Sequence, residues 1–104
     1  MKRSYEMLES QEIIKIIKDK YPEIKKRFHV IEIGLFGSCA RDEAEEGSDI
    51  DLLVEMEEGY NDLFNLIDLK DFLESVLNAP VEIIPRRGIR QALKDRIFKE
   101  TIYV

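Results

Sequence analysis

The segment Leu35-Phe36-Gly37-Ser38, followed eleven residues after its serine by Asp49-Ile50-Asp51-Leu52-Leu53-Val54, decides the fold of this chain. A Gly-Ser turn follows one apolar strand, and two carboxylates stand at alternate positions where a second apolar strand begins. Side chains at i and i+2 of a strand point to the same face, roughly 6.5–7 Å apart along the chain. The pattern therefore predicts two strands that bring a small turn and a pair of acids together.

The pair of acids is typical of a metal site. Cations in two-metal sites lie about 3.5–4 Å apart, a separation that two carboxylates on one strand face can serve. Ile50, Leu52 and Val54 are predicted to form the buried face of the strand, so the opposite face carries two acids where strand propensity disfavours them. Bound cations would stabilise such like charges. We therefore expect Asp49 and Asp51 to bind metal; the alternative is two solvated acids at the entry to a strand.

The Gly-Ser turn is a candidate phosphate-binding site. Backbone N–H groups at a tight turn and a serine hydroxyl can donate hydrogen bonds to a phosphate. The structural alternative is a strand-to-helix turn, in which Gly37 supplies an unusual φ and Ser38 caps a short helix through Cys39-Ala40-Arg41. The two interpretations are compatible, because a capped helix start also binds anions. The chain has neither a P-loop motif nor a dinucleotide-binding motif.

A third carboxylate and one arginine complete the candidate residues. Glu82 interrupts the apolar strand Val81-Glu82-Ile83-Ile84, where a buried charge needs a partner. If this strand lies beside the one that carries Asp51, Glu82 completes a triad, as a ligand of a second metal or as a proton acceptor. Otherwise it is an exposed glutamate at the sheet edge. Arg41, three residues past Ser38, could either reach a triphosphate or pair with the acidic loop.

The composition indicates one soluble domain. With 104 residues, of which 44% are hydrophobic and 37% charged, the chain is predicted to form a single domain over residues 1–104. No apolar run is long enough to span a membrane, and the N-terminus lacks the apolar segment of a signal peptide. The single cysteine excludes an intrachain disulfide, which agrees with a cytoplasmic location.

Charge is distributed unevenly along the chain. The net charge of −6 argues against direct binding of nucleic acid, which usually requires a basic surface. Nine acids and no base lie between Asp42 and Glu58, whereas six bases and one acid lie between Arg86 and Lys99. The basic run is either a solvated helix or a surface that binds a partner or a triphosphate.

The order of the predicted elements favours an α/β or α+β domain with three core strands. Helical periodicity begins near Met7 and is predicted to end at Pro22, because the residue before a proline is displaced from the α region; residues 22–28 could add a turn of helix with Pro22 at its first position. A long helix with Asn61 as its N-cap is expected to end at Asn78-Ala79-Pro80. The other expected elements are strands over 30–36, 50–55 and 81–84, a tail helix over 88–99 and a short last strand over 101–104.

Together these motifs resemble the polymerase-beta-like nucleotidyltransferase superfamily. Phe36-Gly37-Ser38-Cys39-Ala40-Arg41 joined to Ser48-Asp49-Ile50-Asp51-Leu52-Leu53-Val54 is similar to its minimal nucleotidyltransferase branch, the MNT proteins. The resemblance implies a minimal palm, a small mixed sheet with helices on one side, that binds a nucleoside triphosphate and two Mg²⁺ ions. It also implies roles for five residues: metal ligation by Asp49 and Asp51, phosphate contacts by Gly37 and Ser38, and the third acid at Glu82.

The MNT branch further implies a reaction and a partner. MNT antitoxins transfer AMP from ATP to a tyrosine of a HEPN-family ribonuclease toxin. Only twenty-two residues follow Glu82, which leaves no room for a separate acceptor-binding domain. We therefore expect a metal-dependent AMP transferase whose acceptor is held by another protein. Two alternatives remain open: an antitoxin that masks the toxin by binding alone, and a small-molecule nucleotidyltransferase that acts as a homodimer.

Overall fold

The computed structural model describes residues 9–45 and 47–104. Its helices are α1 (Ser10–Phe28), α2 (Leu63–Leu77) and α3 (Gln91–Glu100), and its strands are β1 (Val30–Phe36), β2 (Ile50–Met56), β3 (Val81–Pro85) and β4 (Ile102–Tyr103). The first turn of helix expected near Met7 lies outside the described residues. Within the described ranges, no helix is both long and apolar enough to cross a bilayer.

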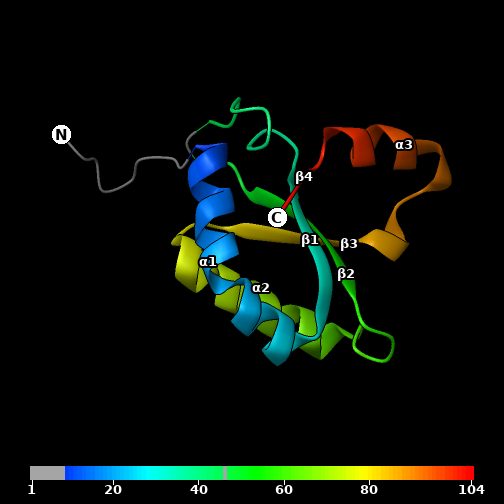
Figure 1. Ribbon diagram of the computed structural model, residues 1–104. Coiled ribbons are helices and arrows are strands. Elements are labelled where there is room, and N and C mark those ends of the chain that lie inside the picture. The colour runs from blue at the N-terminus through cyan, green and yellow to red at the C-terminus, as the bar shows by residue number, and fades with distance from the viewer. Residues whose placement is uncertain (1–8, 46) are drawn as a thin grey trace.

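The four strands form one mixed sheet in the order β3-β2-β1-β4 (Figure 1). β1 pairs antiparallel with both β2 and β4, whereas β2 pairs parallel with β3. A parallel pair requires a crossover connection, which α2 provides. The α+β class and the small mixed sheet are therefore confirmed, and the short last strand that was expected joins the three core strands as β4.

The hydrophobic core lies between one face of the sheet and helices α1 and α2 (Figure 1). Ile50, Leu52 and Val54 of β2 all belong to this core, as their alternation predicted. α2 packs against α1 and β3, and α1 also packs against β1. α3 does not join these helices but lies apart from them (Figure 1). One sheet face is thus covered by α1 and α2, and Asp51, which alternates with Ile50 and Leu52, lies on the other face.

The first helix continues through Pro22, so the predicted helix end at this proline is wrong. Proline lacks the N–H group for one helical hydrogen bond and crowds the preceding turn, at a cost of ~3 kcal/mol or more. The segment that follows places Ile24 and Phe28 in the core, where they are 0% and 3% exposed. Burying each such side chain contributes roughly 1.5–3 kcal/mol, which offsets the cost of the proline.

Three smaller boundaries also differ from the sequence-based expectation. Cys39-Ala40-Arg41 forms consecutive turns rather than a short helix. Asp62 rather than Asn61 caps α2, because its carboxylate accepts a hydrogen bond from the N–H group of Asn65 at 3.0 Å. The tail helix begins at Gln91 rather than at residue 88, since a 3-10 turn at Arg86–Gly88 and two extended residues come first.

Candidate active site

The end of β1 and the start of β2 lie side by side and place the Gly-Ser turn against the carboxylate of Asp51. Phe36, the last residue of β1, pairs with Asp51 across the sheet, so the turn begins directly beside this acid. Gly37 has a φ of +78°, which confirms the unusual conformation predicted for it. A Cβ built on Gly37 would lie 2.5 Å from Oδ2 of Asp51. Only glycine leaves room for both the turn and the carboxylate.

The turn after Gly37 is held by its own backbone. The carbonyl of Gly37 accepts hydrogen bonds from the N–H groups of Ala40 and Arg41, at 3.1 and 3.3 Å. The carbonyl of Ser38 accepts one from the N–H group of Glu43 at 2.8 Å. The turn therefore has a defined shape beside Asp51, as a phosphate-binding turn requires. Contact of Gly37 and Ser38 with a phosphate stays a prediction.

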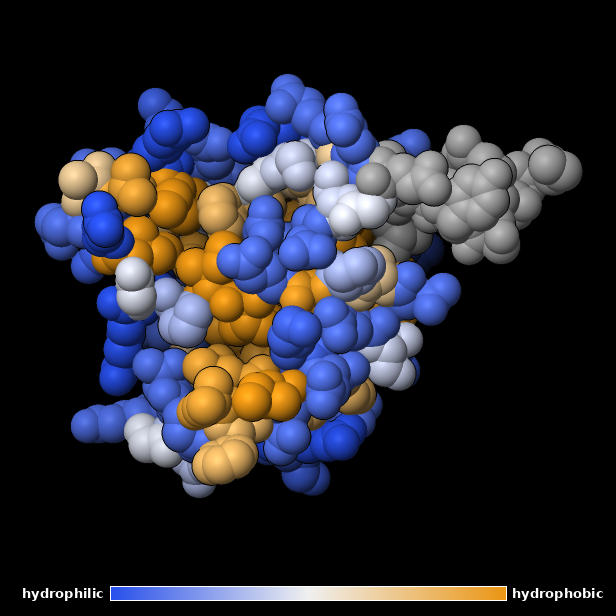
Figure 2. Space-filling view, turned by 180° about the vertical axis from the view of Figure 1, so that it is seen from behind, coloured by the Kyte–Doolittle hydropathy of each residue, from blue (hydrophilic) through white to orange (hydrophobic). Residues whose placement is uncertain are grey.

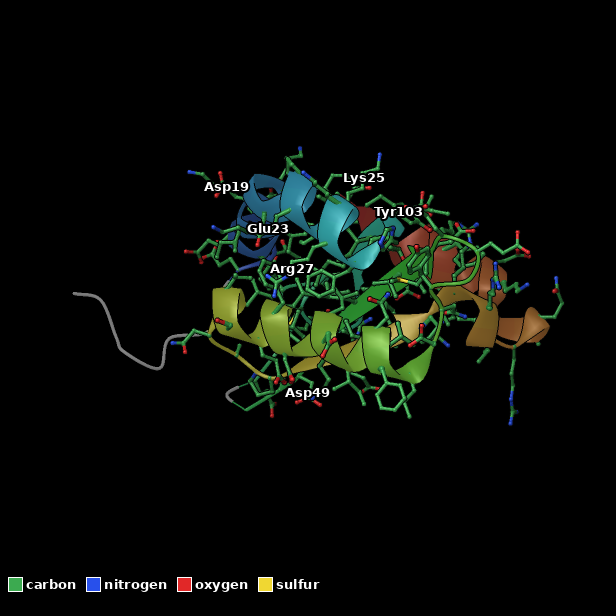
Figure 3. All side chains as sticks on the ribbon, turned by 90° about the horizontal axis from the view of Figure 1, so that it is seen from below. Asp19, Glu23, Lys25, Arg27, Asp49 and Tyr103 are labelled. Carbon is green, nitrogen blue, oxygen red and sulfur yellow. The ribbon has the colours of Figure 1, made fainter. Side chains whose placement is uncertain are left out.

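Three carboxylates gather at this end of the sheet. Glu82 is exposed on the edge strand β3 and is in register with Asp51 on β2, so the strand of Glu82 lies beside that of Asp51, and its role as a third acid stays a prediction. Asp49 directly precedes β2 and is exposed, and Figure 3 shows it beside α2. Burial, and then the negative charges of Glu82 and Asp49, raise the pKa of Asp51 above its ordinary value. Asp49 and Glu82 therefore both lie close enough to Asp51 to interact with it electrostatically.

The chemistry of these acids suits a divalent cation held jointly with a substrate. Among residues 9–45 and 47–104, no three His, Cys, Asp or Glu side chains are already gathered into a metal-binding group. Mg²⁺ prefers oxygen ligands, however, and is usually held by one or two carboxylates plus substrate phosphates. Burial and then the negative charges of Glu82 and Asp49 raise the pKa of Asp51, and a bound cation would offset the contribution of these charges. Asp49, Asp51 and Glu82 thus fit metal ligation, and this role stays a prediction.

Arg41 is engaged by two carboxylates. Its guanidinium donates to Glu43 at 3.0 Å and to Glu100, the last residue of α3, at 3.1 Å. Because Glu43 belongs to the acidic run, the structure shows the pairing that was one of the two interpretations of Arg41. A nucleotide contact would require Arg41 to leave these partners, and stays a prediction.

Arg86, the first residue of the basic run, has a structural role. Its Nη1 lies 2.7 Å from Oε1 of Glu32 and 3.6 Å from Oε1 of Glu55. Its guanidinium also lies over the ring of Phe98, 4.4 Å from the centroid. Arg86 therefore joins strands β1 and β2 to helix α3, so at least this residue of the basic run is not simply a solvated side chain.

A groove of about 360 Å³ lies beside the acids, between α2 and the edge strand β3. Two candidate catalytic acids, Asp49 and Glu82, form part of its wall. Lys70 and Glu74 also line it and form an ion pair at 3.3 Å. The other lining residues are apolar: Leu63, Leu66, Ile67, Pro80, Val81 and Ile83. The candidate site thus continues into a largely apolar groove.

Sequence reasoning missed this groove. α2 buries Leu69, Leu73 and Leu77, yet its apolar residues extend beyond this set. Leu63 and Ile67 line the groove and are 68% and 44% exposed. The signal in the sequence was that α2 has more apolar residues than one buried face of a helix needs. Only the packing shows which of these residues remain exposed.

Comparison with known proteins identifies the family. A family model of the nucleotidyltransferase domain matches residues 10–104. The chain belongs to this nucleotidyltransferase family. The protein adenylyltransferase MntA of Thermococcus cleftensis is 37% identical over 98 residues, which cover 94% of this chain and 98% of that protein. A proposed protein adenylyltransferase of Methanocaldococcus jannaschii is 43% identical over 88 residues, 85% of this chain and 94% of that protein.

Solved structures agree with this assignment. A proposed minimal nucleotidyltransferase superimposes with a TM-score of 0.77 at 33% identity, covering 91% of this chain and 95% of that chain. A toxin–antitoxin structure with AMP-PNP superimposes with a TM-score of 0.64 at 25% identity, covering 92% of this chain and 72% of that one. The resemblance inferred from the Gly-Ser turn and the Asp-Ile-Asp motif is therefore confirmed: this nucleotidyltransferase has the minimal form of the fold.

Proposed function

We propose that this nucleotidyltransferase transfers AMP from ATP to a tyrosine of a HEPN-type ribonuclease toxin and thereby acts as its antitoxin. The observation that carries the proposal is the fixed Gly-Ser turn directly beside Asp51, with Asp49 and Glu82 close enough to affect the pKa of Asp51. The relatives support a protein acceptor, because one of them is named a protein adenylyltransferase. The toxin–antitoxin structure with AMP-PNP, an ATP analogue, supports the nucleotide and the kind of partner.

In the proposed reaction, Gly37 and Ser38 hold the triphosphate and the acids face the α-phosphate. The tyrosine oxygen attacks the α-phosphorus, the bond from this phosphorus to the bridging oxygen of the β-phosphate breaks, and pyrophosphate leaves. Phenol has a pKa near 10 and is a poor nucleophile at pH 7, so we assign the removal of its proton to Glu82. Two Mg²⁺ ions held by Asp49 and Asp51 would neutralise the charge on the phosphates, and ligation of the second ion is the alternative role of Glu82.

The modification would silence the toxin through its charge. An AMP group adds an anion to the tyrosine, and an anion beside the path of the RNA repels the phosphate backbone of the substrate. We place this reaction in the cytoplasm, in agreement with a chain whose one cysteine, Cys39, is free and buried.

Intact-mass analysis tests the proposal. A HEPN-type ribonuclease, sought first in the genes next to that of this chain, is incubated with this protein, ATP and MgCl₂, and a parallel sample lacks ATP. We expect the partner to gain the mass of one or more AMP units and to lose ribonuclease activity. The loss should persist after this protein is removed. Full recovery of activity without a gain in mass would instead support an antitoxin that masks its partner by binding alone.

A further inference from the structure

The groove between α2 and β3 lies on the opposite side of the acids from the Gly-Ser turn. In the sheet, Glu82 on β3, Asp51 on β2 and the turn that ends β1 follow one another in this order. The groove is lined by Asp49 and Glu82 at one end and extends from them along α2. A molecule in the groove would therefore meet the acids from the side that the turn does not occupy.

The geometry of phosphoryl transfer assigns different roles to the side of the Gly-Ser turn and the side of the groove. In phosphoryl transfer the attacking and leaving oxygens lie roughly in line on opposite sides of the phosphorus. If the Gly-Ser turn holds the leaving pyrophosphate, the attacking hydroxyl arrives from the side of Glu82. We propose that the groove, together with the exposed apolar side chains at the start of α2, docks the protein segment that carries the acceptor hydroxyl. This inference rests on the proposed function and adds to it the surface that the acceptor uses.

Three large apolar side chains at the start of α2 are exposed. Leu63, Phe64 and Ile67, which we call the α2 patch, are 68%, 79% and 44% exposed. Leu63 and Ile67 are four residues apart, so they are neighbours on the helix surface, and both line the groove. Figure 2 views the molecule from the side of α2 and shows hydrophobic side chains gathered at the bottom, over the start of this helix. The patch therefore continues the apolar wall of the groove onto the surface.

The charges of the groove select a protein over a nucleic acid. Its lining contains three acids, Asp49, Glu74 and Glu82, and one base, Lys70. Lys70 is already paired with Glu74 at 3.3 Å. Proteins bind nucleic acids mainly through cationic side chains that neutralise the phosphates. In the described lining the one cation, Lys70, is already paired, and the acids outnumber it. A protein segment with one or two large apolar side chains next to its acceptor hydroxyl matches both the apolar wall and the acidic end.

Single substitutions with a matched control test the docking surface. Ile67→Glu and Leu63→Glu place a charge in the α2 patch, and Leu93→Glu places one on α3, where Leu93 is also 44% exposed. Four quantities are measured for each variant: the Kd for the HEPN-type protein without ATP, the KM and the kcat for AMP transfer to it, and the Kd for ATP with Mg²⁺. Thermal melting followed by circular dichroism shows which variants are folded.

We expect Ile67→Glu and Leu63→Glu to raise the Kd and the KM for the partner by about tenfold or more, as loss of an apolar anchor does. The kcat and the affinity for ATP should stay at wild-type values, because the substitutions lie away from the turn and leave the acids in place. Leu93→Glu should match the wild type in every measurement. If Ile67→Glu fails to fold, Leu63→Glu gives the result, since Leu63 is the more exposed side chain.

Three outcomes would overturn the inference. The first is partner binding by the α2 variants that equals that of Leu93→Glu. The second is transfer of AMP to an RNA 3′ hydroxyl in place of the protein. The third is a wild-type dimer in sedimentation that Ile67→Glu dissociates, which would make the patch a self-association surface. If the wild type binds its partner through the patch but transfers no AMP to it, the docking surface stands and the proposed function fails.

Discussion

Asp42 binds the first residue of α1: the N–H group and the hydroxyl of Ser10 donate to its carboxylate, at 2.8 and 2.9 Å. Ser10 is only 3% exposed. Asp42 has a φ of +56° and lies in the loop that follows the Gly-Ser turn. The first N–H groups of a helix have no partner within the helix, so Asp42 satisfies one of them. The contact also fixes the loop beside the candidate site to the start of α1.

Asp42→Ala should lower the free energy of unfolding by about 1–3 kcal/mol, because it leaves the N–H group and hydroxyl of Ser10 without an acceptor. Asp42→Asn is the control, since asparagine tolerates a positive φ and keeps one acceptor oxygen, and its loss should be smaller. Urea denaturation measures both variants. Equal midpoints for Asp42→Ala and the wild type would show that this contact does not stabilise the fold.

Gly37→Ala should abolish nucleotide binding, because its Cβ would meet the carboxylate of Asp51. Gly59→Ala is a matched control: Gly59 has a φ of +90°, and nothing lies within 4 Å of a Cβ built there. Both variants should lose about 1–2 kcal/mol of stability from the left-handed conformation, and Gly37→Ala should lose more because its Cβ also displaces Asp51. Only Gly37→Ala should lose affinity for ATP with Mg²⁺, measured by calorimetry. Equal ATP affinities for the two variants would separate the Gly-Ser turn from phosphate binding.

Replacing Asp49 and Asp51 together with Asn should abolish AMP transfer while the metal-free protein keeps its thermal stability or gains some. The folded state raises the pKa of Asp51, so its charged form is disfavoured on folding. Stability therefore falls as pH rises through the range between the ordinary and the raised pKa, and Asn removes this loss at neutral pH. Differential scanning calorimetry and a transfer assay measure the two effects. Transfer at even a tenth of the wild-type rate would show that the two aspartates are not the metal ligands.

Glu82→Gln tests the third acid separately. If Glu82 removes the proton of the acceptor hydroxyl, the rate of transfer should fall by about 10²–10⁴-fold, while the affinity for the nucleotide is largely retained. Single-turnover kinetics with radiolabelled ATP measures the rate. An unchanged rate would leave Glu82 as an exposed glutamate at the edge of the sheet.

Glu74 should make part of the free energy of unfolding depend on pH in the acid range. Its carboxylate accepts hydrogen bonds from the N–H group of Val81 at 2.9 Å and from Lys70 at 3.3 Å, and these contacts lower the pKa of Glu74. The lowered pKa means that the stabilisation is complete above the ordinary glutamate pKa and is lost as pH falls through the lower, folded value. Glu74→Gln should therefore lose less stability than the wild type between neutral and acid pH. Urea denaturation as a function of pH checks this, and parallel curves for the two proteins would contradict it.

Much of the fold follows from local patterns in the sequence. The alternation of Ile50, Leu52 and Val54 predicted the buried face of β2, because side chains alternate along any strand. The helix end at Pro22 was predicted wrongly, since a local rule about proline cannot include the burial of Ile24 and Phe28 in a distant core. Local preference fails where tertiary packing supplies a larger free energy than the local cost.

Some features of the candidate site also follow from local sequence, whereas others depend on tertiary packing. By itself the sequence determined the acids and the Gly-Ser turn, because their spacing along two strands depends only on backbone geometry. The register of Asp51 with Glu82 and its place against Gly37 depend on the tertiary structure, since strand order and register arise from contacts between distant segments. The tertiary structure alone also shows that Arg41 pairs with Glu100 and that Leu63 and Ile67 stay uncovered in the groove that Asp49 and Glu82 line. An apolar side chain is apolar in any context, but whether it meets a core, a partner or water depends on what the rest of the chain has already covered.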